Sequence, residues 1–96
     1  MAFKLLYHED ALVDLEVLFV WSRERNPRTT EQFASDLFNH LDLLKEFPFV
    51  GTPIKKEPNV RRLLHSPVYV YYRIDERREG VEILHFWHTS RQPPRF

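Results

Sequence analysis

Residues 68–75 read Val-Tyr-Val-Tyr-Tyr-Arg-Ile-Asp, and residues 81–91 read Val-Glu-Ile-Leu-His-Phe-Trp-His-Thr-Ser-Arg. The first segment alternates between two sets of side chains, which predicts a β-strand because successive strand residues point to opposite faces. The set expected to face the core is Val68, Val70, Tyr72 and Ile74, and the opposite set is Tyr69, Tyr71 and Arg73. The second segment is apolar on both faces, which favours a central strand over residues 81–88.

Further strands are expected on either side of this pair. Residues 60–65 form another expected strand, and Ser66-Pro67 is a turn signal that joins it to residues 68–75. Residues 76–80 are charged, end in glycine and predict a hairpin loop. Near the N-terminus, residues 3–7 are a short apolar run without helical periodicity, which predicts a first strand.

A first helix is expected over residues 11–25, with Asp10 as its N-cap. Its inner stripe consists of Ala11, Leu15, Leu18 and Ser22, with Phe19 beside them. A second apolar stripe, largely on the opposite side, consists of Val13, Val17, Val20 and Trp21. Because a surface helix usually has a polar back, this second stripe indicates a surface for a partner or a second copy. The alternative is that another element of the domain covers it.

A second helix is expected over about residues 30–46, after a break at Asn26-Pro27. Thr29 and Gln32 fit a capping box at its start. Its buried stripe would be Phe33, Leu37, Leu41 and Leu44, and its solvent-exposed face would carry Asp36, Asn39 and Asp42. Residues 47–53 hold two prolines and a glycine, which predicts a loop.

The expected element order is β-α-α-β-β-β, an α+β fold in one domain over residues 1–96. A helical hairpin would pack on one face of an antiparallel sheet and leave the other face open. Arg62, Tyr69, Tyr71 and Arg73 are candidates for that open face. Arginine with tyrosine on a sheet can bind phosphate or stack on bases. The alternative is an ordinary sheet face that cross-strand pairs stabilise.

Composition narrows the classes of function. The chain has no cysteine, which excludes disulfides, thiolate metal sites and a cysteine nucleophile. Its 14 basic and 14 acidic residues give no net charge, which argues against a general nucleic-acid binder. Residues 51–96 nevertheless hold nine basic and five acidic residues, so a local basic patch remains open. No apolar run approaches the ~20 residues of a membrane span and no signal pattern is present, so a cytoplasmic protein is expected.

His85 and His88 are three residues apart, which on a strand places them on opposite faces. They would therefore not hold one metal ion together, and no metal site is expected. Either histidine could instead serve as a general base, or be a hydrogen-bonded structural residue. The absence of a glycine-rich phosphate loop makes a nucleotide cofactor unexpected, and no cofactor is predicted.

The ordered set of segments resembles the ParE/RelE superfamily of bacterial type II toxins. Glu9-Asp-Ala-Leu-Val-Asp-Leu15 is similar to the opening of that family's first helix, and Arg23-Glu-Arg-Asn-Pro27 to its inter-helix turn. Phe47-Pro-Phe-Val-Gly-Thr-Pro53 resembles its loop, and residues 61–91 resemble its three closing strands. The resemblance implies the same fold and a co-expressed antitoxin that wraps and neutralises the toxin.

The resemblance also implies one of two activities. RelE-like members cleave mRNA on the ribosome, whereas ParE-like members poison DNA gyrase and are not regarded as nucleases. Here Tyr69 stands where the nuclease pattern often has an arginine, and no tyrosine follows Arg91. These departures favour a ParE-like gyrase inhibitor of the plasmid-stabilisation type. A ribosome-dependent endoribonuclease is the alternative, with His88, Arg62 and Arg91 as its acid-base and phosphate-binding set.

The ParE-like interpretation assigns two contact regions. Target binding is expected at Arg73, His88, Arg91 and Arg95. Antitoxin binding is expected at Val13, Val17, Val20, Trp21, Tyr69 and Tyr71. The expected antitoxin is ParD-like or another small DNA-binding protein, which would add a strand to a free edge or a helix to a groove. A homodimer or a toxin–antitoxin hetero-oligomer is the expected assembly.

Overall fold

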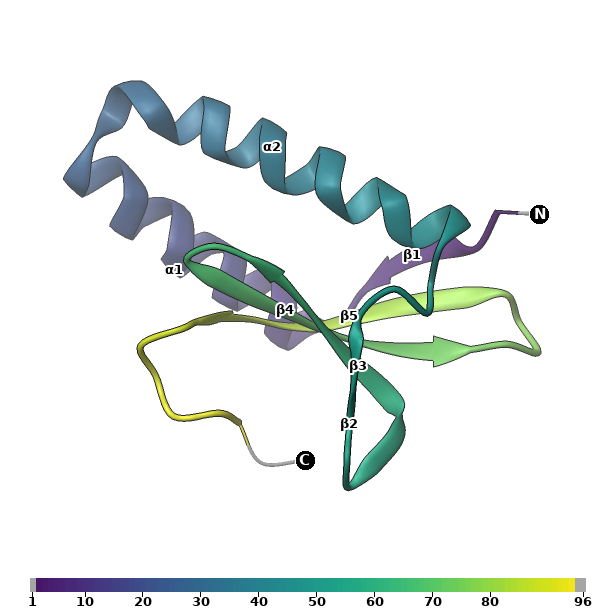
Figure 1. Ribbon diagram of the computed structural model, residues 1–96. Coiled ribbons are helices and arrows are strands. Elements are labelled where there is room, and N and C mark those ends of the chain that lie inside the picture. Colours follow the sequence, from purple (N-terminus) through teal and green to yellow (C-terminus); the bar gives the residue numbers. More distant parts are fainter. Residues whose placement is uncertain (1, 95–96) are drawn as a thin grey trace.

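The structure, a computed structural model, describes residues 2–94. Within these residues, two helices and five strands follow one another in this order: β1 (Lys4–Tyr7), α1 (Glu9–Arg25), α2 (Pro27–Glu46), β2 (Thr52–Ile54), β3 (Glu57–His65), β4 (Val68–Asp75) and β5 (Gly80–His88). The helical hairpin lies along one side of a single sheet (Figure 1). The predicted α+β architecture is therefore confirmed.

The sheet has the strand order β1-β5-β4-β3-β2 and is mixed. Strands β2 to β5 form an antiparallel meander, whereas β1 runs parallel to β5. The prediction of an antiparallel sheet is therefore wrong for β1. β2 is an additional strand inside the segment expected to be a loop. It is only three residues long and contains Pro53, and a short strand with proline suits the sheet edge that β2 occupies.

The helix starts differ from those expected. His8, not Asp10, is the N-cap of α1, and its Nδ1 accepts a hydrogen bond from the Asp10 backbone N–H at 3.1 Å. Asp10 instead lies in the first turn, where its charge complements the helix dipole. α2 begins at Pro27 rather than near residue 30, because Asn26 caps it by accepting from the Arg28 N–H at 3.2 Å. Thr29 is therefore not the cap of this helix.

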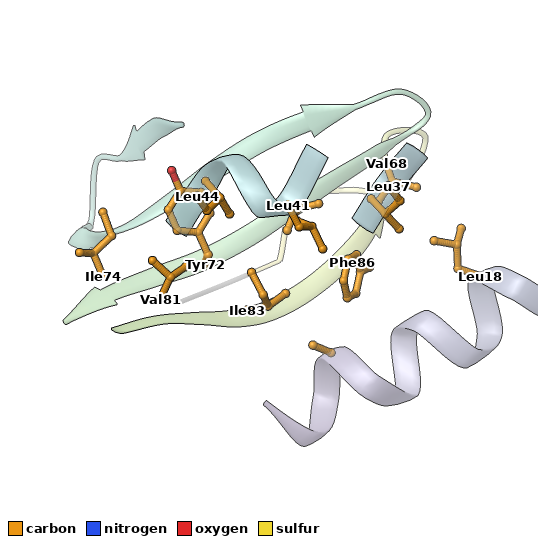
Figure 2. Packing of buried hydrophobic residues seen from close by; sticks show 12 residues of the cluster. Leu18, Leu37, Leu41, Leu44, Val68, Tyr72, Ile74, Val81, Ile83 and Phe86 are labelled. Carbon is orange, nitrogen blue, oxygen red and sulfur yellow. The ribbon is translucent and has the colours of Figure 1, made fainter. Parts of the chain in front are cut away.

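The main core lies between the helices and the sheet. Leu37, Leu41 and Leu44 from α2 are fully buried against the predicted inner set of β4: Val68, Val70, Tyr72 and Ile74. Figure 2 shows this layer, with Val81, Ile83 and Phe86 of β5 completing it. The alternation along β4 thus predicted its two faces correctly.

Tyr72 ties the loop after α2 to this core. Its hydroxyl donates to the Pro48 carbonyl at 2.8 Å and accepts from the Gly51 N–H at 2.9 Å. Burial raises the pKa of Tyr72, which keeps the hydroxyl protonated as a donor. A Cβ at Gly51 would lie 2.5 Å from this hydroxyl, so the close approach requires glycine.

No helix within residues 2–94 is long and apolar enough to cross a membrane.

Candidate functional site

A groove runs between α1 and the end of β5. It has a volume of about 420 Å³, and its lining consists of Asp14, Val17, Leu18, Trp21, Arg25, Phe86, His88, Ser90 and Arg91. Ring centroids of Trp21 and His88 lie 5.3 Å apart across it. The Arg25 guanidinium stacks on Trp21 at 4.8 Å from its centroid. The groove is therefore lined by apolar side chains together with basic ones, Arg25, His88 and Arg91, and one carboxylate, Asp14.

The outer stripe of α1, Val13, Val17, Val20 and Trp21, borders this groove. We call these four residues the α1 stripe. Val13 is 60% exposed and Val17 is 64% exposed, and no other described element covers them. The alternative that this domain buries its own second stripe is therefore wrong for residues 2–94. Val17 and Trp21 also line the groove, so stripe and groove form one continuous apolar surface.

His88 lies at the groove with a defined hydrogen-bonding pattern. Its Nδ1 accepts from the Ser90 backbone N–H at 3.1 Å and lies 2.7 Å from the Ser90 hydroxyl. Because Nδ1 is the acceptor, the neutral ring carries its proton on Nε2. In this arrangement Ser90 engages the Nδ1 lone pair of the neutral ring, and Nε2 can donate toward the groove.

On the open face of the sheet, two arginine side chains lie over two aromatic rings. The Arg62 guanidinium lies 4.4 Å from the ring centroid of Tyr69, and that of Arg91 lies 3.7 Å from the centroid of Trp87. Tyr69 and Trp87 are cross-strand partners on β4 and β5. Two arginines therefore cover two neighbouring rings, each in cation–π geometry. The Trp87 Nε1 also donates to the Gln92 carbonyl at 2.7 Å, which holds the chain after β5 against this face.

Tyr71 lies on the expected face but is not accessible. Its side chain is 2% exposed because it packs with Val60 and Leu84 in a small second cluster on the open face. The accessible aromatic residues here are Tyr69 and Trp87, which are partly buried. Trp87 was not among the predicted contact residues.

The predicted nuclease set does not converge. His88 pairs with Val68 and turns toward α1, whereas Arg62 stacks on Tyr69 on the opposite face. Arg91 borders both regions, since it lines the groove and covers Trp87. His85 lies beside Trp87, so the two histidines occupy opposite faces as expected. Within residues 2–94, no three metal-ligating side chains are grouped to hold an ion.

The predicted target residues are also divided. His88 and Arg91 both line the groove, while Arg73 lies near the start of α1 and pairs with Glu82 at 3.2 Å. Arg95 lies outside the described residues. Of the three target residues that the structure describes, it therefore brings two together.

Two partly buried polar contacts were not predicted from the sequence. Asp14 Oδ2 lies 3.0 Å from His85 Nδ1 and accepts from the Phe86 backbone N–H at 3.2 Å, which ties α1 to β5. His40 Nδ1 lies 2.8 Å from His65 Nδ1, which joins α2 to the end of β3. The members of each pair are far apart in the sequence. Their spacing therefore gave no signal for the contact between His40 and His65. An acidic residue beside the inner stripe of α1 was a weak signal for the first.

The chain is similar to known toxins of toxin–antitoxin systems. A family model described as the ParE toxin of the type II toxin–antitoxin system parDE matches residues 5–93. A chain in the toxin–antitoxin complex RelBE2 from Mycobacterium tuberculosis is 23% identical, with a TM-score of 0.69 and coverage of 92% of this chain and 99% of that chain. A chain of the chromosomal ParDE system from P. aeruginosa is 18% identical, with a TM-score of 0.75 and coverage of 91% and 96%. No curated protein sequence matches.

Proposed function

The chain belongs to the ParE toxin family of type II toxin–antitoxin systems, and from this premise we propose that it inhibits growth by binding DNA gyrase without cleaving a bond itself. A cognate antitoxin, ParD-like or another small DNA-binding protein, neutralises it in the cytoplasm. Such a pair would act in the manner of a plasmid-stabilisation system. The solved relatives are named as toxin–antitoxin complexes, which supports the antitoxin partner.

One observation carries the choice of binding over cleavage. RNA cleavage needs a base, an acid and phosphate-binding cations around one phosphodiester. Here the Ser90 N–H occupies Nδ1 of His88, and Arg62 lies on the other face of the sheet. A donating Nε2 beside the Arg91 guanidinium suits recognition of an acidic or carbonyl-rich protein surface instead.

The proposed target contact is the part of the groove that carries basic side chains. His88 and Arg91 form its centre, and Arg95 follows closely in the chain. Arg73 is a supporting contact at most, because Glu82 already neutralises it at 3.2 Å. The proposed antitoxin contact is the α1 stripe with Tyr69, since these side chains are accessible and the stripe continues into the groove.

Expression of the chain without antitoxin tests the proposal when DNA breaks and transcript cleavage are read in the same culture. Gyrase-dependent breaks with intact mRNA support it, and purified gyrase should lose supercoiling activity when the chain is added. Cut transcripts with intact DNA would overturn it in favour of the ribosome-dependent nuclease, for which the arginines on the open face are the favouring observation.

Matched variants sharpen this comparison. Arg91→Gln should remove most gyrase inhibition, whereas Arg62→Gln, which removes the same charge from the other face, should retain it. A nuclease should instead lose activity with Arg62→Gln. Binding to the antitoxin should survive both changes and fail with Val17→Asp, whose site is exposed enough for the variant to fold.

A further inference from the structure

The α1 stripe is an apolar helix face on which the described part of the domain contacts Trp21, through Arg25 and His88, and leaves the three valines exposed. Val17 is 64% exposed, and Val13 and Val20 lie one turn away along the same face. Monomeric proteins seldom leave a row of branched apolar side chains open to water. The stripe therefore calls for a partner, and the charges beside it show which one fits.

Glu16 and Arg23 flank the stripe on the same side, because residues seven apart lie nearly above one another on a helix. They are about 10 Å apart along the axis, too far to pair with each other. Both side chains are exposed, and among residues 2–94 neither forms an ion pair. Each is thus an uncompensated charge beside an uncovered apolar surface.

We propose that α1 packs antiparallel against α1 of a second copy of this chain, about a two-fold axis that passes near Val20. This axis lies midway between Glu16 and Arg23, so each copy places its Glu16 opposite the partner's Arg23. The ion pair forms twice because the interface is isologous. Val17, Val20 and Trp21 then close the seam between the two pairs. The inference is independent of the toxin's target.

Glu16 and Arg23 favour a second copy because these two charges are complementary to each other in this one orientation. Glu24, seven residues after Val17, lies on the stripe's own face toward its C-terminal end. A parallel copy would place Glu16 beside the partner's Glu16 and repel it. The stripe is small compared with stable interfaces, so the dimer is weak and concentration-dependent. The antitoxin, which is proposed to cover the same stripe, would compete with it.

Sedimentation of the full chain over a range of roughly 5 to 500 µM tests the proposal. The unmodified chain should dimerise, and Glu16→Arg or Arg23→Glu alone should weaken association about tenfold, since each change turns two attractions into repulsions. The double variant Glu16→Arg/Arg23→Glu should recover most of the lost affinity. Glu57→Arg, an equal charge change on β3, should leave association unaltered.

Cysteine scanning checks the register, because the chain has no cysteine of its own. Oxidation should link Val20→Cys copies close to the axis. Val13→Cys copies should link poorly, since these positions would lie about 20 Å apart along the axis. A chain that stays monomeric throughout the range, or a dimer whose strength ignores both single charge swaps, overturns the proposal. So does a double variant as weak as the single ones.

Discussion

His40 on α2 and His65 on β3 share one short contact, with their Nδ1 atoms 2.8 Å apart and their ring centroids 5.1 Å apart. One ring must donate an N–H to the lone pair of the other. When both Nδ1 atoms carry protons, two N–H groups face each other and the contact is lost. The contact therefore holds one Nδ1 proton but not two.

Stability should consequently fall in mild acid. Burial and the neighbouring His40 lower the pKa of His65 below its usual 6.5, while Asp36 opposes the shift. Because the unfolded state then binds the proton more tightly, the free energy of unfolding is fully retained above about pH 6.5 and decreases as the pH falls toward the lowered pKa. Urea denaturation across this window measures the loss. His65→Gln should flatten the profile, whereas His88→Gln should leave its slope in place.

Tyr72→Phe should lower the free energy of unfolding by about 1–3 kcal/mol, because it leaves the Gly51 N–H and the Pro48 carbonyl without their partner in a buried place. Tyr69→Phe is the matched control. It keeps the ring under Arg62 and should change stability by less than about 0.5 kcal/mol. Equal effects of the two changes in urea denaturation would contradict the role assigned to the Tyr72 hydroxyl.

Asp14→Ala should loosen α1 from the end of β5. The change removes the acceptor for the Phe86 N–H and the partner of His85, and should lower the free energy of unfolding by about 1–2 kcal/mol. Hydrogen exchange at the Phe86 amide should accelerate more than at the amides of β3. Asp10→Ala, an exposed change on the same helix, should have little effect on either measurement.

Glu79→Gly should stabilise the β4–β5 loop. Glu79 has a φ of 49°, a left-handed conformation that is unfavourable for a side chain with a Cβ. Glycine adopts this conformation without strain, so the thermal midpoint should rise. The gain in the free energy of unfolding should be about 1 kcal/mol or less, because glycine also gives the unfolded chain more freedom. Glu76→Gly in the same loop, where φ is not positive, should lower the midpoint.

The periodic patterns of the sequence predicted which face of a strand or helix each side chain occupies. The alternation along β4 placed Val70 and Tyr72 in the core and Tyr69 on the other face, and helical spacing identified both stripes of α1. The exposed α1 stripe could be foreseen because a short chain has few elements to cover it. These features follow from the periods of strand and helix alone.

Contacts between distant segments could not be predicted in this way. Whether β1 runs parallel to β5 depends on where the helical hairpin returns the chain. The separation of Arg62 from His88, and the contact between His40 and His65, depend on strand register. The burial of Tyr71 depends on a bulge near Leu84 that gives the open face its own small core.

Asn26 serves as the C-cap of α1 and the N-cap of α2, so one residue joins the two helices. A residue inserted at this point would separate the two capping roles of Asn26 and change how α2 returns to the sheet. The junction therefore fixes the length of the hairpin. Relatives of different length, and peptide tags added by engineers, should be accommodated in the β4–β5 loop, where exposed residues separate two strands already held in register.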